Sequence, residues 1–288
     1  MSTVHLVECP RDAMQGWPVM IPVEKKIEYL NLLLRVGFQT LDFGSFVSPK
    51  AIPQMADTKY VLPQLDWQDS PTKLLAIVAN LRGAQDAVEY EQVKYLGFPF
   101  SVSETFQQRN TNSSISESLQ TVAAIQQLCL RKRKKLVVYL SMGFGNPYGD
   151  PWSEQVVFQW AEKLVEMGIT IISLADTVGL ATPDQVGTIT DYLIKALPDT
   201  EIGVHLHSTP VNWKPKVDAA LQAGCLRFDG ALKGIGGCPM ANDDLVGNMN
   251  TELMIAHFES LGILPALDKK ALMESLHMAD EIFTTAHT

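Results

Sequence analysis

The feature that most constrains this fold is a regular alternation of short apolar segments with longer amphipathic ones. Short β-branched or apolar runs recur along the chain, and the stretches between them carry apolar residues at helical spacing. The predicted strands cover residues 4–8, 38–42, 73–78, 93–101, 136–141, 169–174, 202–205 and 226–230. The predicted helices cover residues 23–36, 58–65, 83–90, 115–130, 153–167, 183–196, 211–223 and 251–261.

These strands and helices form eight consecutive units with no polar linker between them. Eight such units in about 260 residues are typical of a (β/α)8 barrel. The alternative is an open doubly wound sheet, which would be expected to carry a glycine-rich phosphate-binding fingerprint after an early strand, and this chain has none. We therefore expect an α/β protein with a (β/α)8 TIM barrel. Residues 1–288 should form a single catalytic domain, with an outer C-terminal helix at about 265–288.

Composition narrows the class of partner. The formal net charge is −9, and the only dense basic run, residues 131–135, suits the C-terminal end of a helix, so we expect no nucleic-acid partner. No apolar run approaches the ~18 residues that span a membrane, and no signal peptide is visible. The four cysteines are widely spaced and form no CxxC motif. These features predict a reduced, cytoplasmic protein without a membrane partner.

Polar residues lie at or just after the predicted C-terminal ends of the strands, where the active site of such a barrel forms. Any one of them can be a structural hydrogen-bonding group, but their convergence on one end predicts a single site. They are Arg11, Asp12, Asp42, Ser45, Glu104, Ser141, Ser173, Asp176, Thr177, His205, His207, Lys233 and Asn248.

A metal site is predicted within this set. His205 and His207 are spaced i, i+2 and point the same way if both lie on a strand. Together with Asp12 and Asn248 they make a mixed oxygen and nitrogen ligand set, which Mg²⁺, Mn²⁺ or Co²⁺ accepts and structural zinc does not require. Cys238, which follows Gly236 and Gly237, adds a thiol on a glycine-rich loop nearby.

These residues resemble the 3-hydroxy-3-methylglutaryl-CoA lyase family, within a superfamily of metal-dependent aldolases and lyases that also holds isopropylmalate and homocitrate synthases. The similarity runs from about residue 4 to residue 261. Its motifs are Pro10-Arg11-Asp12 with Gln15, Ser45-Phe46-Val47-Ser48-Pro49-Lys50, Ser103-Glu104, Asp176-Thr177, His205 with His207, Gly236-Gly237-Cys238-Pro239, and Gly247-Asn248 with Thr251-Glu252. The SFVSPK and GGCP segments are specific to the lyases among these enzymes.

The resemblance implies cleavage of 3-hydroxy-3-methylglutaryl-CoA, a CoA thioester, to acetyl-CoA and acetoacetate, with Mg²⁺ or Mn²⁺ as the metal. It implies that His205 takes the hydroxyl proton with Asp176 nearby, that Arg11 stabilises charge on the enolate oxygen, and that Cys238 helps to protonate the enolate carbon. A homodimer is expected as well. The residues expected to contact or support the substrate are Gln15, Asp42, Ser45, Glu104, Ser173, Thr177, Gly236, Gly237 and Glu252.

The chain departs from the family's pattern at three places. Asp42 stands where the family usually has glutamate, Ala13 follows the PRD motif where it usually has glycine, and Ser208 stands where it often has aspartate. A related lyase acting on another 3-hydroxyacyl-CoA is therefore an alternative. A synthase condensing acetyl-CoA with a 2-oxo acid is a second, and a catalytically silent barrel a third. The intact polar set at the barrel mouth argues against the third.

Overall fold

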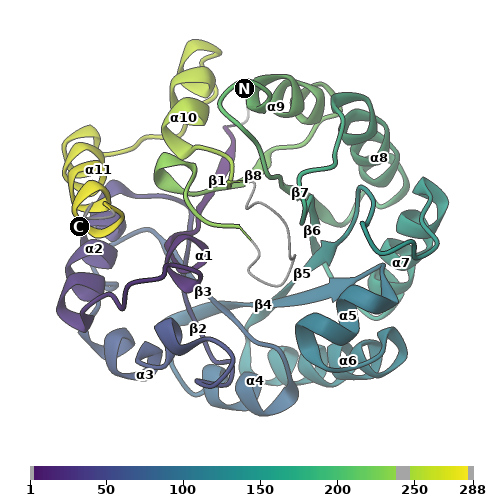
Figure 1. Cartoon of the computed structure of the whole chain (residues 1–288), viewed down its shortest axis with the longest axis horizontal. Helices are drawn as coiled ribbons and strands as arrows, with labels where there is room; N and C mark the ends of the chain where they lie inside the picture. Colours follow the sequence, from purple (N-terminus) through teal and green to yellow (C-terminus); the bar gives the residue numbers. More distant parts are fainter. Residues whose placement is uncertain (1–2, 238–246, 285–288) are drawn as a thin grey trace.

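The computed structural model describes residues 3–237 and 247–284. Within these residues eight parallel strands follow one another in sequence order, and the last pairs with the first to close a barrel. Figure 1 shows the strands enclosed by a ring of helices. The strands are β1 (His5–Glu8), β2 (Thr40–Ser45), β3 (Lys73–Ile77), β4 (Val93–Ser101), β5 (Lys135–Ser141), β6 (Ile171–Ala175), β7 (Glu201–His205) and β8 (Arg227–Gly230). The predicted (β/α)8 TIM barrel is confirmed.

Each predicted helix is present, with ends that shift by a few residues. The long ones begin where side chains satisfy the free backbone N–H groups: Ser114 with Glu117, and Thr182 with Gln185, form capping boxes. The helices are α1 (Pro10–Gln15), α2 (Val23–Val36), α3 (Thr58–Val61), α4 (Leu81–Val88), α5 (Glu104–Thr111), α6 (Ile115–Lys132), α7 (Glu154–Glu166), α8 (Pro183–Ala196), α9 (Trp213–Gln222), α10 (Thr251–Ser260) and α11 (Lys269–Ile282). The short helices α1 and α5 were not predicted from the sequence.

Two strand ends differ from the sequence prediction, and both differences move site residues. The strand expected at 38–42 is β2, which begins at Thr40 and reaches Ser45, so Asp42 lies inside the strand and not at its end. A register shift against β3 between Asp42 and Gly44 lengthens β2 in this way. The expectation that β7 carries both histidines was wrong for His207, because β7 ends at His205. His207 lies beyond the strand, in an isolated antiparallel bridge with Asn248.

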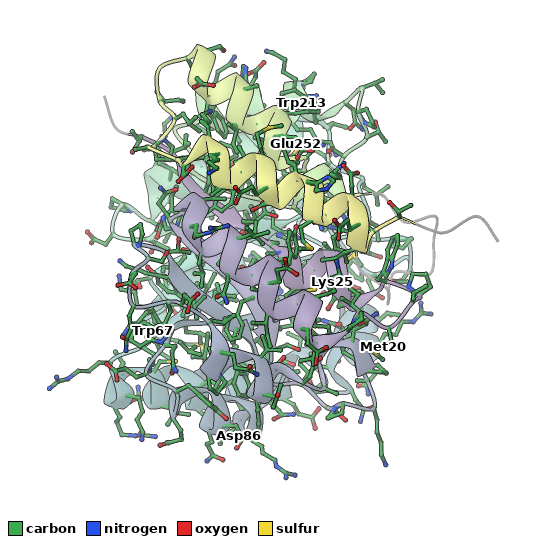
Figure 2. All side chains as sticks on the ribbon, turned by 90° about the vertical axis from the view of Figure 1, so that its left-hand side faces the viewer. Met20, Lys25, Trp67, Asp86, Trp213 and Glu252 are labelled. Carbon is green, nitrogen blue, oxygen red and sulfur yellow. The ribbon has the colours of Figure 1, made fainter. Side chains whose placement is uncertain are left out.

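The last helix covers the first long one. Helix α11 begins at Lys269 because the Asp268 side chain accepts hydrogen bonds from the backbone N–H groups of Lys270 and Ala271. Figure 2 shows α11 lying alongside α2, which carries Lys25. Lys25 and Glu281 form an ion pair across this contact, with Nζ 2.5 Å from Oε2. No helix within the described part of the chain combines the length and apolar character that crossing a bilayer requires.

The barrel interior holds an apolar cluster and a buried arginine. Buried residues of the lumen form a cluster of Leu75, Tyr95, Val137, Tyr139 and Ile171. On the neighbouring strands Arg227 is buried, and Gly203 leaves room for it, because a Cβ at Gly203 would lie 2.6 Å from Arg227 Cδ. At the N-terminal end of the barrel, His5 and the partly exposed Glu201 contact the Arg227 guanidinium.

Candidate active site at the barrel mouth

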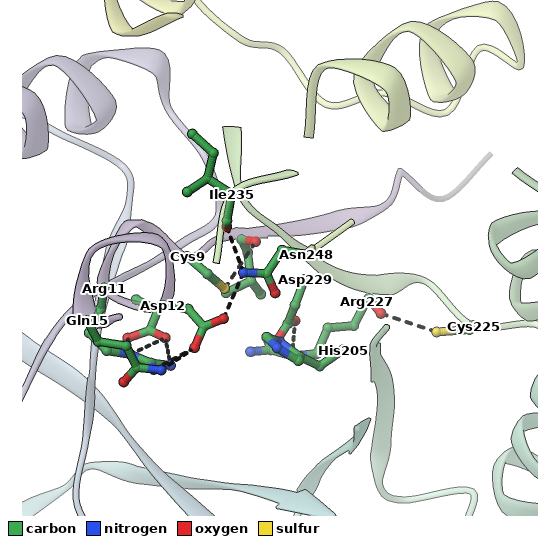
Figure 3. A network of polar contacts seen from close by, with 12 residues as sticks. Cys9, Arg11, Asp12, Gln15, His205, Cys225, Arg227, Asp229, Ile235 and Asn248 are labelled. Atoms are coloured by element: carbon green, nitrogen blue, oxygen red, sulfur yellow. Dashed lines mark hydrogen bonds and ion pairs between the residues drawn. The ribbon is translucent and has the colours of Figure 1, made fainter. Parts of the chain in front are cut away.

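A cavity of about 430 Å³ opens at the C-terminal ends of the strands. Its inner part is lined by residues that the sequence predicted for the site: Arg11, Asp12, Gln15, Ser45, Ser141, Thr177, His205 and His207. Its outer part is lined by α5 and the loops after β2 and β3, including Ser48, Asn80, Arg109, Asn110 and Asn112. Apolar side chains such as Val47, Ile52 and Phe106 also line the outer part, so the cavity runs from a charged floor to a mixed polar and apolar rim. Figure 3 shows much of the floor.

Asp12 is the centre of the floor. Helix α1 starts directly after β1 with Pro10 at its first position, which directs Arg11 and Asp12 into the mouth. Asp12 Oδ1 accepts hydrogen bonds from Arg11 Nη1 and Gln15 Nε2, both at 2.8 Å, and Oδ2 accepts one from Asn248 Nδ2 at 2.7 Å. Burial acts to raise the pKa of Asp12, but the Arg11 charge and these donors outweigh it and lower the pKa to about 2. Asp12 is therefore ionised near neutral pH, and its hydrogen bonds hold the carboxylate in one orientation.

Arg11 is held from its other side by Asp42. Asp42 Oδ2 lies 3.1 Å from Arg11 Nε and 2.5 Å from Nη2, a two-pronged contact between buried groups. Burial raises the pKa of Asp42 to about 6, although the neighbouring guanidinium acts in the opposite direction. Because two aspartates grip it, the guanidinium has one orientation at the cavity wall. The shorter aspartate thus pairs with Arg11 directly.

The two histidines complete a group suited to a metal ion. Ligand atoms of Asp12, His205 and His207 all lie within 4.8 Å of one another. Burial, followed by the charge of His205, lowers the pKa of His207 to about 4, so its imidazole is neutral and able to ligate. Asn248 Oδ1 is buried and has no hydrogen-bond partner among the described residues, while its amide nitrogen donates to Asp12 and to Ile235 O. A free buried acceptor beside three ligands fits a divalent cation.

Asp229 on β8 is a site residue that the sequence analysis missed. Its Oδ2 lies 3.3 Å from His205 Nδ1, and the carboxylate is buried. Burial acts to lower the pKa of His205, but the hydrogen bond and charge of Asp229 oppose this, and the pKa is raised overall. The available signal was the alternation of Arg227 and Asp229 on a buried strand, which places two charged side chains on its inner face.

Asp176 does not line the cavity, although it was expected to act beside His205. Its Oδ2 accepts a hydrogen bond from Lys216 Nζ at 2.8 Å, and its Oδ1 accepts one from Ala181 N at 3.0 Å. Lys216 is buried on α9 and also donates to His207 O at 2.8 Å. Asp176 and Lys216 therefore fix the backbone at His207. Nothing in the sequence distinguished Lys216 from a solvated lysine.

The remaining predicted residues divide between the site and its surroundings. Ser45 and Thr177 line the cavity, and Thr177 Oγ1 accepts a hydrogen bond from Met142 N at 2.9 Å. Ser173 is buried on β6, two residues after the lumen residue Ile171. Glu104 is exposed and accepts a hydrogen bond from Ile115 N, which joins α5 to the start of α6.

Glu252 also lies outside the cavity lining. Both of its carboxylate oxygens accept from Lys233 N, at 3.1 and 2.9 Å, and so hold the short turn after β8. Glu104 and Glu252 thus support the backbone, and the structure does not bring either of them to the floor of the cavity.

The glycine pair makes room for Asn248. Gly236 and Gly237 have φ values of +111° and +136°, which favour glycine. A Cβ at Gly236 would lie 2.5 Å from Asn248 Nδ2 and 2.9 Å from Asp12 O. The predicted catalytic Cys238 lies outside the described residues.

The chain is similar to known proteins over nearly its whole length. The chain is 35% identical over 272 residues to a hydroxymethylglutaryl-CoA lyase of Bacillus subtilis, which covers 94% of this chain and 90% of that protein. It is 33% identical over 277 residues to a cytoplasmic 3-hydroxy-3-methylglutaryl-CoA lyase of Rattus norvegicus, covering 94% and 79%.

Solved structures show the same similarity in three dimensions. A Bacillus subtilis HMG-CoA lyase superposes with a TM-score of 0.90 at 33% identity, covering 98% of this chain and 95% of the other. An HMG-CoA lyase from Acinetobacter baumannii, solved with coenzyme A and 3-methylmalate, gives a TM-score of 0.89 at 32% identity, covering 97% and 91%. The HMGL-like family model matches residues 5–278. The expected family is confirmed, and the chain belongs to the HMGL-like family.

Proposed function

We propose that this protein is a carbon–carbon lyase that cleaves 3-hydroxy-3-methylglutaryl-CoA to acetyl-CoA and acetoacetate. The observation that carries the proposal is the grouping of Asp12, His205 and His207 beside Arg11 on the floor of a 430 Å³ cavity. The relatives named above are lyases of this substrate, and one was solved with coenzyme A.

The reaction needs a base, a group that stabilises negative charge and a proton donor. The substrate has a tertiary alcohol β to a thioester. Loss of the hydroxyl proton lets the adjacent C–C bond break, so that the oxygen becomes the ketone of acetoacetate and the electron pair becomes the enolate of acetyl-CoA. A proton then adds to the enolate carbon. Each of these roles has a candidate in this chain.

Asp12, His205, His207 and Asn248 would hold the metal, for which their mixed oxygen and nitrogen atoms favour Mg²⁺ or Mn²⁺. A bound divalent cation supplies Lewis-acid polarisation of the substrate's hydroxyl and carboxylate oxygens.

The chain's own residues then share the steps. His205 takes the hydroxyl proton at Nε2, and Asp229 keeps its ring in one orientation through Nδ1. While Nε2 carries this proton it is not a ligand, and Asp12, His207 and Asn248 would hold the metal. Arg11, immobilised by Asp42, offers its guanidinium to the enolate oxygen. Cys238 protonates the enolate carbon. Asp176 acts at one remove, because its carboxylate holds Lys216 and through it the backbone of His207.

The test is an acetoacetate assay. We expect the pure protein to form acetoacetate and acetyl-CoA in equal amounts from 3-hydroxy-3-methylglutaryl-CoA with Mn²⁺ or Mg²⁺. Activity should vanish on chelation and return when metal is added back. Cys238→Ser should lower turnover far more than it lowers Mn²⁺ affinity, which equilibrium titration measures separately. Absence of product in fully metal-loaded protein would contradict the proposal.

The related substrates are tested in the same assay. The Asp42–Arg11 pair shapes the wall where the acyl group would lie, so a panel of 3-hydroxyacyl-CoA esters measures how far the shorter aspartate widens acceptance. Incubation with acetyl-CoA and 2-oxo acids tests the condensing direction. A higher kcat/KM for another ester would identify that ester as the preferred substrate, and the proposed type of reaction would stay the same.

We also propose that residues 1–288 act as one catalytic domain, that the protein is a homodimer, and that it works in the cytoplasm. The close match of nearly the whole chain to single lyases supports the first point. Closed two-fold dimers are the commonest oligomers, which supports the second. Light scattering coupled to size exclusion measures the oligomer, and fractionation of the source cells measures the location.

A further inference from the structure

We propose that Cys9, His205 and Asp229 form a second metal site, for a thiophilic divalent ion such as Zn²⁺. Their ligand atoms lie within 4.8 Å of one another. All three residues come from strands or strand ends that meet in the barrel, on β1, β7 and β8. Figure 3 shows His205 beside Asp229, on the side of Asp12 away from Gln15.

The histidine and the aspartate already stand at a suitable separation. His205 Nδ1 lies 3.3 Å from Asp229 Oδ2. Tetrahedral zinc with bonds of about 2.0–2.1 Å to nitrogen and oxygen places such ligands about 3.3–3.4 Å apart. An ion can therefore replace the proton between these two atoms without moving either residue.

Cys9 supplies the sulfur that distinguishes this site from the first. Its Sγ is buried and makes one weak contact in the described structure, with Val7 O at 3.8 Å. Thiolate ligands favour Zn²⁺ and similar ions over Mg²⁺ or Mn²⁺. Asp229 Oδ1 is also buried without a hydrogen-bond partner among the described residues, so it can complete the coordination.

The local charge favours a divalent ion. The buried carboxylates of Asp12, Asp42 and Asp229 outnumber the guanidinium groups of Arg11 and Arg227 by one. Binding through Cys9 releases the thiol proton and adds a second negative charge, which a divalent cation balances.

Binding is tested with Co²⁺, whose thiolate complexes absorb strongly in the near ultraviolet while sites without sulfur do not. The metal-free protein is titrated as wild type and as the Cys9→Ala, Cys225→Ala and Cys238→Ser variants, with circular dichroism as the check on folding. Cys225 is the matched control, because its thiol is also buried but donates to the backbone oxygens of Ile202 and Arg227 and belongs to no group of metal ligands among the described residues.

We expect the charge-transfer band in wild type, Cys225→Ala and Cys238→Ser, and its loss in Cys9→Ala. Asp229→Asn should weaken Co²⁺ binding at this site while the band survives at higher concentration. A wild-type protein without the band, a band that persists in Cys9→Ala, or a band lost in Cys238→Ser would each overturn the proposal.

A second readout rests on the proposed lyase function. An ion at Nδ1 moves the ring proton to Nε2, the atom that takes the hydroxyl proton of the substrate, so Zn²⁺ should inhibit acetoacetate formation even when Mn²⁺ saturates the other ligands of the first site. Cys9→Ala should raise the inhibitory Zn²⁺ concentration by at least the roughly 10–100-fold that losing a hydrogen-bond partner of a metal ligand costs. Equal Zn²⁺ sensitivity in wild type and Cys9→Ala would overturn it. If the protein proves to have another substrate, the Co²⁺ titration still decides the site.

Discussion

The two ends of the barrel both bury charged side chains, but they use them differently. At the N-terminal end, His5 Nε2 lies 2.9 Å from Thr40 Oγ1 and 3.2 Å from Arg227 Nη1, and the cluster closes on Glu201, whose side chain is 40% exposed. At the mouth, Asp12 is buried among donors, while Asn248 Oδ1 beside it has no partner among the described residues. Charged groups that pair with one another and reach solvent, as at the N-terminal end, stabilise the fold. Buried charged groups beside a cavity, next to an acceptor without a partner among the described residues, are suited to bind an ion or a ligand.

The strongest test of this difference between the two ends of the barrel is to replace one histidine at each end. His207→Ala should reduce Mn²⁺ affinity and turnover by at least about 100-fold, because it removes a neutral buried ligand. His5→Ala, the matched change at the other end, should leave Mn²⁺ affinity unchanged and lower only the unfolding midpoint. Equilibrium Mn²⁺ titration and thermal melts measure both. Equal Mn²⁺ affinity in wild type and His207→Ala would remove His207 from the ligand set.

Two glycine substitutions, one beside the predicted metal ligands and one beside Arg227, test the same difference with a smaller expected effect. The Cβ of Gly236→Ala would meet Asn248 and Asp12, so Mn²⁺ affinity should fall roughly 10–100-fold. The positive φ of Gly236 adds a cost of about 1–3 kcal/mol of unfolding free energy. The Cβ of Gly203→Ala would meet Arg227, and overpacking of this kind costs about 1–3 kcal/mol of unfolding free energy. Urea unfolding and Mn²⁺ titration of both variants check this. Gly203→Ala should keep wild-type Mn²⁺ affinity, and the idea fails if it loses this affinity as Gly236→Ala does.

The pH dependence of Mn²⁺ binding in the Asp229→Asn variant tests the role of Asp229 at the barrel mouth. Asp229 raises the pKa of His205, so its neutralisation lowers that pKa and leaves the imidazole unprotonated at more acidic pH. The acidic limb of Mn²⁺ binding should therefore move to lower pH, even if the maximal affinity also falls. Mn²⁺ titrations from pH 5 to 8 measure the limb. A limb that stays in place, or moves to higher pH, would contradict the assigned role of Asp229.

The smallest expected effect concerns Glu8, a buried carboxyl that lies outside the cavity lining. It accepts hydrogen bonds from Leu232 N and Thr251 Oγ1, and burial raises its pKa from 4.5 to about 8. Because the unfolded chain gives up this proton more readily, the unfolding free energy should fall as pH rises from about 5 to 8. Glu8→Gln can still accept from Leu232 N through its amide oxygen and can donate through its amide nitrogen to Thr251 Oγ1, and it should flatten that slope. Urea unfolding at several pH values measures it, and an unchanged slope would mean that Glu8 is ionised in the folded protein.

Sequence alone predicted the barrel and the core of the site, because strand ends of a (β/α)8 barrel converge by topology. Asp12, Arg11 and the histidine pair could be placed in this way. Asp229 could not, because its significance depends on the side-by-side position of β7 and β8. Glu104 and Glu252 follow motifs of the family, yet their side chains cap backbone groups near the mouth.

Local irregularity accounts for the other differences. The register shift in β2 places Asp42 inside the strand, opposite the Arg11 guanidinium. The bridge between His207 and Asn248 joins the chain after β7 to the chain after β8. A single bridged pair has no periodic sequence pattern from which it could be predicted. The buried Lys216 lies in a run with Lys214 and Pro215 that reads as solvent-exposed.

The pairing of β1 with β8 has a consequence for how the protein is made. Asp12 is synthesised near the beginning of the chain, and His205, His207 and Asn248 near its end. A nascent chain therefore has no ligand set until its final strand leaves the ribosome and docks beside the first. Such long-range closure is slow compared with local pairing, and it delays metal capture until β7, β8 and Asn248 have been synthesised.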